Sequence, residues 1–300
     1  MIELPSRARP RGDELIELLL ETGTETGATA STETRGDLND GLVRRYGGPL
    51  SIPLRPDRPT IVANFVQTID GVVSMDAGRS GGGDVSGFSP ADRFVMGLLR
   101  TLADVVLVGA GTFRASGGRG WTPARAFPAA AAEFAEQRRG LGLAPNPTTL
   151  VVTSTGELDP NHPGLQDPAA PAVIAGPDRA VERLAGAGLP AHVRLETLAA
   201  DRPAGVELPA LARRLGARIV LSEAGPHLAG ELISAGAIDE LFLTLSPQLA
   251  GRDAATHRLS LVEGTALWPA SPRWLRLLSA RRAGDHLLLR YRFEESGNEG

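Results

Sequence analysis

An alternation of apolar runs and helical stretches, starting at Thr60, constrains the fold of this 300-residue chain more than any other feature. Short runs of β-branched and apolar residues are typical of buried strands, and longer stretches with apolar positions three or four apart are typical of helices. These patterns predict strands at residues 60–66, 104–108, 149–153, 172–175, 193–195 and 218–221, and helices at 90–100, 129–139, 178–187 and 207–215. Strands that alternate with helices form a mostly parallel sheet flanked by helices, so we expect an α/β protein.

The C-terminal part of the pattern differs from the rest. Residues 239–245, 274–281 and 286–293 are strand-like, and the last two runs are joined by Ala283-Gly284-Asp285. A short glycine-containing connection between two such runs is typical of a hairpin. We therefore expect antiparallel C-terminal strands that close one edge of the sheet.

The first fifty residues are only weakly patterned. A short amphipathic helix is expected at residues 13–20, followed by a flexible segment rich in Thr, Gly and Glu at 21–36. A proline-rich linker at 49–59 leads into the main domain. This divides the chain into an N-terminal extension, residues 1–57, and one main domain, residues 58–295.

The composition excludes several kinds of chemistry. The chain has no Cys and no Lys, so all 31 residues counted as Lys or Arg are Arg. A disulfide, a thiolate nucleophile, a thiolate metal site and a Schiff-base lysine are therefore excluded. A net charge of -4 argues against nucleic acid as the main partner. No apolar run approaches the ~18 residues of a membrane span, so we expect a cytoplasmic protein that binds a small molecule and no metal.

Two glycine-containing turns follow the first two predicted strands, where open α/β sheets bind ligands. The first, residues 67–71, ends in Asp70-Gly71. Its carboxylate can accept hydrogen bonds from a ligand, but Asp-Gly is also a common turn pair. The second, residues 108–114, contains Gly109 and Gly111, whose backbone can approach a phosphate at a helix start. A tight strand-to-helix turn explains this second segment equally well.

A third turn, residues 221–231, places Glu223 at a strand end and Pro226 in the first turn of a helix whose N–H groups face an anion. The dinucleotide fingerprint fails in the chain because it needs a third glycine where Arg114 stands. A P-loop would need Lys, a zinc deaminase would need Cys, and no serine-nucleophile elbow is found among the turns. A phosphate-carrying cofactor remains possible without these motifs.

In their order along the chain, these segments resemble the C-terminal reductase domain of the RibD family of riboflavin biosynthesis. The resemblance is carried by residues 68–71, by Leu99-Arg100 with 104–112, by 223–230 and by 238–251, and it covers residues 58–293. It implies a dihydrofolate-reductase-like fold in which NADPH reduces a ribosylamino-pyrimidine phosphate by hydride transfer. It also implies a homodimer, for which the apolar strand expected at 286–293 would offer an edge.

The resemblance assigns roles to individual residues. Glu223 and Asp70 are implied as catalytic carboxylates, and Arg100, Glu223 and Asn64 as substrate-binding residues. Contacts with NADPH are implied at Val66, Thr68, Gly109, Gly111, Thr112, Ser116, Ser154, Gly225, Pro226, His227, Leu228, Ala229 and Gly230. A helix start near Gly225 suits a pyrophosphate, and hydroxyl groups can hydrogen-bond to ribose or phosphate oxygens.

Departures from the family pattern concentrate on the substrate side. The family has a Lys at the position of Asn64, and its Ser-x-Trp-Ile-Thr segment is replaced by residues 82–88. Its Asp-Asp-Pro after the second glycine turn reads Ala115-Ser116-Gly117-Gly118. A fixed positive charge for the substrate would have to come from an arginine, with Arg100 first and then Arg114 or Arg119.

Three functions follow as hypotheses. The first is an NADPH-dependent reductase that transfers a hydride to an imine-like or aldehyde-like carbon of a pyrimidine substrate. Glu223 or Asp70 would supply polarisation or a proton, and Arg100 would bind an anionic group. The second keeps the cofactor and takes a pterin such as dihydrofolate. The third is a non-catalytic NADPH-binding protein, because the departures spare the cofactor side.

Overall fold

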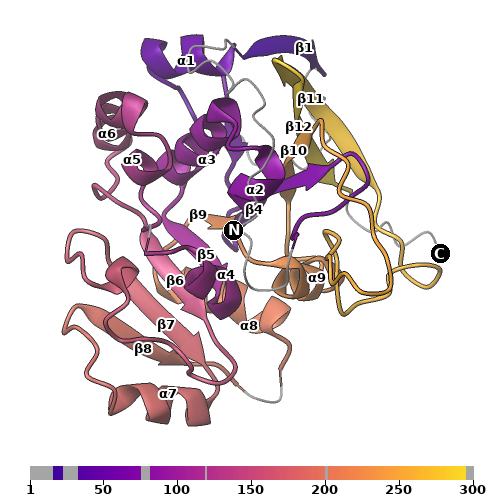
Figure 1. Ribbon diagram of the computed structural model, residues 1–300. Helices are drawn as coiled ribbons and strands as arrows, with labels where there is room; N and C mark the ends of the chain where they lie inside the picture. Colours follow the sequence, from indigo (N-terminus) through magenta and orange to yellow (C-terminus); the bar gives the residue numbers. More distant parts are fainter. Residues whose placement is uncertain (1–15, 23–32, 76–81, 119, 200–201, 295–300) are drawn as a thin grey trace.

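One mixed sheet organises the residues that this computed structural model describes, which are 16–22, 33–75, 82–118, 120–199 and 202–294. Its strands follow the order β1-β11-β12-β10-β4-β9-β5-β6-β7-β8 (Figure 1). A separate short pair joins β2 to β3. The strands are β1 (Glu17–Glu21), β2 (Thr34–Arg35), β3 (Ile52–Pro53), β4 (Thr60–Thr68), β5 (Val105–Gly109), β6 (Thr148–Val152), β7 (Ala172–Gly176), β8 (Val193–Thr197), β9 (Ile219–Ser222), β10 (Glu240–Ser246), β11 (Leu275–Ala283) and β12 (His286–Phe293).

Helices cover both faces of this sheet. One layer contains α1 (Asp40–Tyr46), α3 (Pro90–Leu102), α6 (Ala131–Gly140) and α7 (Asp178–Ala185), and the other contains α8 (Ala204–Arg214) and α9 (Pro226–Ser234). Alternate residues of a strand face opposite layers. Val106 therefore shares a core with α3, and Leu107 shares one with α8. The shorter helices are α2 (Gly82–Ser86), α4 (Ala110–Ala115), α5 (Pro123–Ala126) and the 3-10 turns at Pro128–Ala130 and Pro163–Leu165.

The strands from β10 to β8 run parallel to one another. β9 lies between β4 and β5 although the chain forms it much later. The carboxyl ends of these strands meet at one edge of the sheet. At the other side of β10, strands β12, β11 and β1 pair in antiparallel fashion. The predicted α/β class, with a mostly parallel sheet and antiparallel C-terminal strands, is confirmed.

Helix α3 illustrates why the local pattern was informative. The Ser89 hydroxyl accepts a hydrogen bond from the Asp92 N–H at 3.4 Å, and Pro90 occupies the first turn, where no N–H is needed. The apolar stripe expected from the spacing is buried, as Phe94, Leu98 and Thr101 show. The helix therefore begins where the sequence predicts and continues two residues beyond the predicted end.

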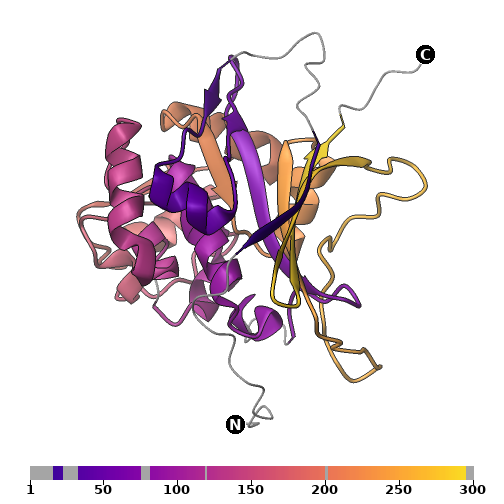
Figure 2. The ribbon, with the colours of Figure 1, turned by 90° about the horizontal axis from the view of Figure 1, so that it is seen from above.

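The predicted N-terminal helix is wrong over residues 17–20, which belong to strand β1, while residues 13–15 lie outside the described part. β1 pairs with β11, and Figure 2 shows it beside the yellow C-terminal strands. A helix of about eight residues is marginal on its own. Pairing with β11 supplies ladder hydrogen bonds and brings Glu17 to Arg282 at 2.8 Å.

Part of the predicted N-terminal extension, residues 1–57, belongs to the main core. Leu42, Tyr46, Leu50, Ile52 and Leu54 are all buried among residues of α3 and the sheet. β2 and β3 pair within this segment, whereas residues 23–32 lie outside the described part. The extension and the domain thus share one hydrophobic core.

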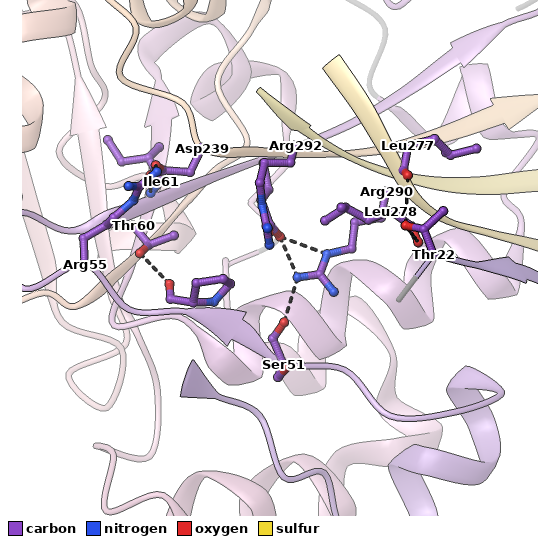
Figure 3. Close-up of polar contacts among 12 residues, drawn as sticks. Thr22, Ser51, Arg55, Thr60, Ile61, Asp239, Leu277, Leu278, Arg290 and Arg292 are labelled. Carbon is purple, nitrogen blue, oxygen red and sulfur yellow. Dashed lines mark hydrogen bonds and ion pairs between the residues drawn. The ribbon is translucent and has the colours of Figure 1, made fainter. Parts of the chain in front are cut away.

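Polar contacts fix this N-terminal segment to the start of the central strands (Figure 3). Arg290 on β12 donates to the carbonyl of Ser51 at 2.7 Å and to Glu240 at 2.9 Å. Asp239 accepts from Arg58 at 2.7 and 2.9 Å and from the N–H of Ile61 at 2.9 Å. This network lies at the amino ends of β4 and β10, opposite the strand ends that carry the candidate site.

Two expectations about the C-terminal strands need correction. β10 is antiparallel only to β12 and runs parallel to β4, because the crossover through α9 returns the chain in the parallel sense. The hairpin does not close the edge of the sheet either. β12 lies between β10 and β11, and β1 forms that edge, with Leu18, Leu19 and Leu20 exposed. The edge argument for a homodimer therefore does not apply to residues 286–293.

Candidate active site

The carboxyl ends of four neighbouring strands gather most of the predicted site. β4 ends before Asp70, β9 before Glu223, β5 before Thr112 and β6 before Ser154. These strands are neighbours in the order β4-β9-β5-β6. The glycine turns are far apart in the sequence, and the parallel sheet brings them to one edge.

Two predicted substrate-binding residues, Arg100 and Glu223, form a single unit. The Nε and Nη2 atoms of Arg100 donate to the two carboxylate oxygens of Glu223 at 2.7 and 2.6 Å. The two side chains are only 7% and 10% exposed. The Nη1 atom of Arg100 donates to the carbonyl of Thr122 at 3.3 Å. A bidentate pair of this kind is strong and directional, so Arg100 fixes the orientation of Glu223.

Asp70 is held by its own chain. Its carboxylate accepts from the Thr68 hydroxyl at 2.5 Å and from the N–H groups of Ala250 and Gly251 at 3.1 and 2.7 Å. These hydrogen bonds, led by the one from Thr68, lower the pKa of Asp70 to about 2. An exposed carboxylate in this state is ionised at neutral pH and has no proton to give. The geometry supports a role in fastening the loop after β10 to the end of β4.

Two residues of β4 that were predicted to contact the cofactor, Thr68 and Val66, make contacts within the protein. Thr68 is fully buried, and its hydroxyl donates to Asp70 and accepts from the N–H of Val72 at 2.9 Å. Val66 is 9% exposed, and its Cγ1 would lie 3.2 Å from a Cβ added to Gly82 of α2. The Thr68 hydroxyl proton is already donated to Asp70, so this side chain could donate to a ligand only by giving up that contact.

The start of α9 leaves its first-turn N–H groups without a side-chain acceptor. Gly225 is its N-cap and offers no side-chain acceptor to the first-turn N–H groups, while Pro226 occupies the first turn. His227 is exposed and Leu228 is half-buried. Uncapped N–H groups at a helix start, together with the helix dipole, favour a negatively charged ligand.

The last two residues of the predicted cofactor run have a packing role. Ala229 and Gly230 are buried in the helix. A Cβ on Gly230 would lie 2.5 Å from the carbonyl oxygen of Glu263, so only glycine allows this approach of the loop to α9. Both residues therefore face the protein interior rather than the helix start.

The second glycine turn lies next to the start of α9. Gly109 is the N-cap of α4, and a Cβ on Gly109 or Gly111 would meet nothing within 4 Å. The Thr112 Oγ1 lies 3.4 Å from the position of a Cβ on Gly225, so the two turns touch. Ser116 lies at the far end of α4, where its hydroxyl donates to the carbonyl of Phe113 at 2.8 Å.

These features fit a dinucleotide. Open space at Gly109 and Gly111 lets a ligand approach the backbone, and the uncapped first turn after Gly225 supplies donors for a pyrophosphate. Ser154, exposed at the end of β6, adds a free-standing hydroxyl group on the next strand. The hydrogen-bond donors of this region are uncharged, and most of them are backbone N–H groups, as expected for recognition of phosphate oxygens.

The sequence did not single out Asp92 of α3, which is a buried acidic residue. Only 4% of it is exposed, and the polar groups that act on its carboxyl include the hydroxyl groups of Thr244 on β10 and Ser86 on α2. Burial raises the pKa of Asp92 to about 6, the charge of Glu223 raises it further, and His286 and the two hydroxyl groups oppose the shift.

A signal for Asp92 was present in the sequence. It stands in line with Val95, Leu99 and Leu102, at spacings of three, four and three residues that predict a buried stripe. An acidic residue in the first helical turn is normally explained by its favourable interaction with the helix dipole. For this reason the sequence alone did not suggest that Asp92 is buried. Asn64 lies nearby in the sheet, half-buried on β4 opposite Phe242 and two residues before Val66, which pairs with Thr244.

Solved structures share this fold. A RibD protein of Acinetobacter baumannii superposes with a TM-score of 0.61 at 20% identity, covering 79% of this chain and 59% of the other. A pyrimidine reductase-like protein of Corynebacterium diphtheriae gives 0.61 at 20% identity, covering 79% and 93%. A deaminase and 5-amino-6-(5-phosphoribosylamino)uracil reductase of Thermotoga maritima gives 0.58 at 18% identity, covering 79% and 57%. The fold is the dihydrofolate-reductase-like fold of these reductases.

Sequence comparison assigns the family. The riboflavin biosynthesis protein RibD of Escherichia coli is 28% identical over 223 residues, which cover 72% of this chain. The chain spans about half, 54%, of the length of that relative. The sequence model of the RibD C-terminal domain matches residues 59–288. This chain belongs to the RibD C-terminal domain family, the reductase family of riboflavin biosynthesis.

Proposed function

We propose that this protein is an NADPH-dependent reductase that transfers a hydride to a heterocyclic substrate. The substrate we propose is 5-amino-6-(5-phosphoribosylamino)uracil, the compound named for the Thermotoga maritima relative. One observation carries the proposal. The uncapped start of α9, the open glycine turn after β5 and the Arg100–Glu223 pair lie at the ends of adjacent parallel strands.

The cofactor side of this proposal rests on the backbone. The N–H groups after Gly225 would hold the pyrophosphate, and Thr112 and Ser154 would contact phosphate or ribose oxygens. When bound, NADPH would supply the hydride, and its nicotinamide ring would be left oxidised and positively charged. The protein's contribution is to hold the two ligands in register, which accounts for a large part of the rate in such reactions.

The substrate side of the proposal rests on Arg100, Glu223 and Asn64. Arg100 holds Glu223 in one orientation, so the carboxylate can accept from ring N–H or amino groups of the substrate. Asn64 presents an amide on the adjacent strand and can donate and accept at once. Because Asn64 carries no charge, a pterin such as dihydrofolate is the second substrate to be tested.

Two measurements test the proposal. Titration with NADPH and with NADH, followed by quenching of protein fluorescence or by heat, should show binding and a preference for NADPH; binding of neither would contradict the cofactor assignment. Oxidation of NADPH is then followed with the pyrimidine and with dihydrofolate in separate assays. Turnover of the pyrimidine alone supports the proposal, turnover of dihydrofolate alone replaces the substrate, and tight binding without turnover favours a non-catalytic NADPH-binding protein.

We also propose that the protein is a cytoplasmic homodimer. Within the described residues, no helix is long and apolar enough to cross a membrane. The exposed leucines of edge strand β1, which are 41 to 50% exposed, offer a surface for a second copy. Light scattering at micromolar concentration should give twice the chain mass, and Leu19→Glu should shift the mass toward the monomer. A monomeric mass for the unmodified protein would contradict the dimer.

A further inference from the structure

Two arginines contact the loop that follows β6, residues 153–158, beside the candidate site. Arg114, in the last turn of α4, donates from its Nη1 atom to the carbonyl oxygen of Glu157 at 3.0 Å. Arg183, in the last turn of α7, donates from its Nη1 atom to the carbonyl oxygen of Thr155 at 3.3 Å and to the Glu157 carboxylate at 3.2 Å. Two guanidinium groups from two different helices therefore meet at one short stretch of backbone.

This loop has a defined shape because it packs directly on α7. Gly156 has a φ of +70°, in the left-handed region, and a Cβ at this position would lie 2.6 Å from the carbonyl oxygen of Ala180. The N–H of Gly156 donates to the Thr153 hydroxyl at 3.0 Å, and the N–H of Glu157 donates to the Thr155 hydroxyl at 3.3 Å. Only glycine suits this close approach, so the loop and the two arginines are held together.

Several hydrogen-bond donors at this loop remain available to a ligand. Ser154 and Thr155 are exposed, and the Ser154 hydroxyl makes no hydrogen bond to another described residue. The Thr155 hydroxyl accepts from Glu157, so its own proton can be donated. Arg114 is exposed and, in the described part of the chain, has no carboxylate partner. Hydroxyl and guanidinium donors on one exposed loop suit a phosphate group, whose oxygens accept several hydrogen bonds at once.

The place of the loop in the sheet relates it to the far half of the proposed cofactor. Asn64 lies on β4 and Glu223 follows β9, so the substrate side is at these two strands. β6 lies on the other side of β5, two strands from β9 and about 10 Å away. A dinucleotide with its nicotinamide beside Glu223 and its pyrophosphate at the start of α9 therefore extends its adenosine half toward the end of β6.

We propose that Arg114 and Arg183, together with the Ser154 hydroxyl, bind the 2′-phosphate of the adenosine ribose and thereby select NADPH over NADH. This inference rests on the proposed function and names the residues that recognise the one group by which the two nucleotides differ. A phosphate monoester carries close to two negative charges at neutral pH, and a guanidinium presents paired donors that match its oxygens. NADH has a hydroxyl group at this position, so the arginines strengthen the binding of NADPH alone.

Glu157 is the carboxylate that competes with a phosphate for Arg183. The side chains of Arg183 and Glu157 are 57% and 63% exposed, and an ion pair in such a position contributes little. Arg183 can therefore exchange this carboxylate for a more highly charged phosphate. A carboxylate beside a ribose can also accept a hydrogen bond from the 2′-hydroxyl of NADH. Removing the charge of Glu157 separates these two roles.

The experiment measures the dissociation constants of NADPH and NADH at one fixed ionic strength, by fluorescence quenching or calorimetry. It compares the unmodified protein with Arg114→Gln, Arg183→Gln and Glu157→Gln. Adenosine 2′,5′-bisphosphate and adenosine 5′-monophosphate are measured as well, because they differ only in the 2′-phosphate and carry no nicotinamide. Arg139→Gln is the matched control, since Arg139 is also an exposed arginine in the last turn of a helix, α6.

The arginine variants should each weaken NADPH binding about tenfold or more, the usual effect of losing a charge-assisted hydrogen bond. Their affinity for NADH should stay the same, which also shows that the variants are folded. The loss should recur with adenosine 2′,5′-bisphosphate and be absent with adenosine 5′-monophosphate. Glu157→Gln should tighten NADPH binding by about threefold, and Arg139→Gln should change neither affinity.

Unchanged NADPH affinity in both arginine variants, or equal losses for NADPH and NADH, would overturn the proposal. A preference of the unmodified protein for NADH that Glu157→Gln removes would overturn it as well and would assign the loop to the 2′-hydroxyl. These outcomes are distinguishable from a failure of the proposed function. Selective loss of NADPH binding without turnover of any substrate would support the phosphate site and contradict the reductase, whereas turnover with unchanged selectivity would do the reverse. Binding of neither nucleotide would overturn both.

Discussion

Arg100 and Glu223, 123 residues apart in the sequence, form a bidentate ion pair at 2.6 and 2.7 Å at the centre of the candidate active site. One comes from the last turns of α3 and the other from the residue after β9. The pair ties the helix layer to the ends of the central strands. It turns two residues that the sequence suggested as separate ligand contacts into one unit.

This pair should be strongly coupled in stability. Removing one partner, as in Glu223→Gln or Arg100→Met, leaves a buried charge or acceptor without its partner and should lower the free energy of unfolding by about 3 kcal/mol. The double variant should lose less than the sum of the two single losses, by about 2 kcal/mol. Urea unfolding of all four proteins gives this difference. Strict additivity would show that the pair contributes no coupling.

Asp92→Asn should change the pH dependence of stability. The folded pKa of Asp92, about 6, is above its ordinary value of 3.8, so the folded protein binds this proton more tightly than the unfolded chain does. Its contribution is therefore most favourable below pH 3.8 and is lost as the pH rises through about 6. Removing the charge should stabilise the protein at pH 8 by about 1 to 3 kcal/mol.

Thermal unfolding of both proteins at several pH values measures this effect. The difference between Asp92→Asn and the unmodified protein should shrink as the pH falls from 8 to 5, because Asp92 then becomes neutral as well. A difference that does not vary with pH would show that Asp92 is not the group responsible.

Asp70→Asn should loosen the loop after β10 without disturbing the core. The amide side chain accepts more weakly than the carboxylate that now binds the N–H groups of Ala250 and Gly251. Hydrogen exchange at these two amides should become faster, while amides of β4 keep their protection. In the unmodified protein the lowered pKa of Asp70, about 2, keeps this contact at neutral pH and releases it as the pH falls through about 2. Equal exchange rates in both proteins would contradict this role.

Arg138→Met should destabilise the protein through the end of α3. Arg138 is buried and donates to the carbonyls of Arg100, Thr101 and Ala103, and burial lowers its pKa to about 10, so it stays charged at neutral pH. Losing it leaves these carbonyls without their donor, for an expected loss of about 3 kcal/mol. Arg139→Met, an exposed neighbour on the same helix, is the control and should change stability by less than about 0.5 kcal/mol. Equal effects of the two variants in urea unfolding would contradict the capping role.

The sequence predicted the parts of the fold that depend on local patterns. The strands at Thr60 and Val105 and the helix after Ser89 could be predicted because apolar periodicity and capping residues act within a few residues. Strand β1 could not, since three consecutive leucines suit a helix or a strand and only the distant partner β11 decides between them.

The candidate site, too, could be predicted only where its features depend on local sequence. Glycine turns at strand ends are local features, and the parallel sheet that they imply brings them together. The contacts that give each side chain its role are not local. Thr68 could not be recognised as a buried residue at the end of a strand, nor Asp70 as the anchor of a loop that lies 180 residues further along the chain. The unusual environment of Asp92 could be recognised only after the structure showed that its face of α3 is buried.

Gly111→Ala tests the cofactor assignment separately from stability. Gly111 lies in α4 with nothing within 4 Å of an added Cβ, so alanine fits and should stabilise the helix by up to about 1 kcal/mol. If a dinucleotide lies against this backbone, the added methyl group should weaken NADPH binding about tenfold or more. Gly140→Ala is the matched control, since Gly140 lies in α6, also has open space around it, and is far from the strand ends. It should give a similar gain in stability with unchanged affinity. Unchanged affinity in both variants would place the cofactor elsewhere, because a ligand that approaches the Gly111 backbone closely cannot ignore a new methyl group there.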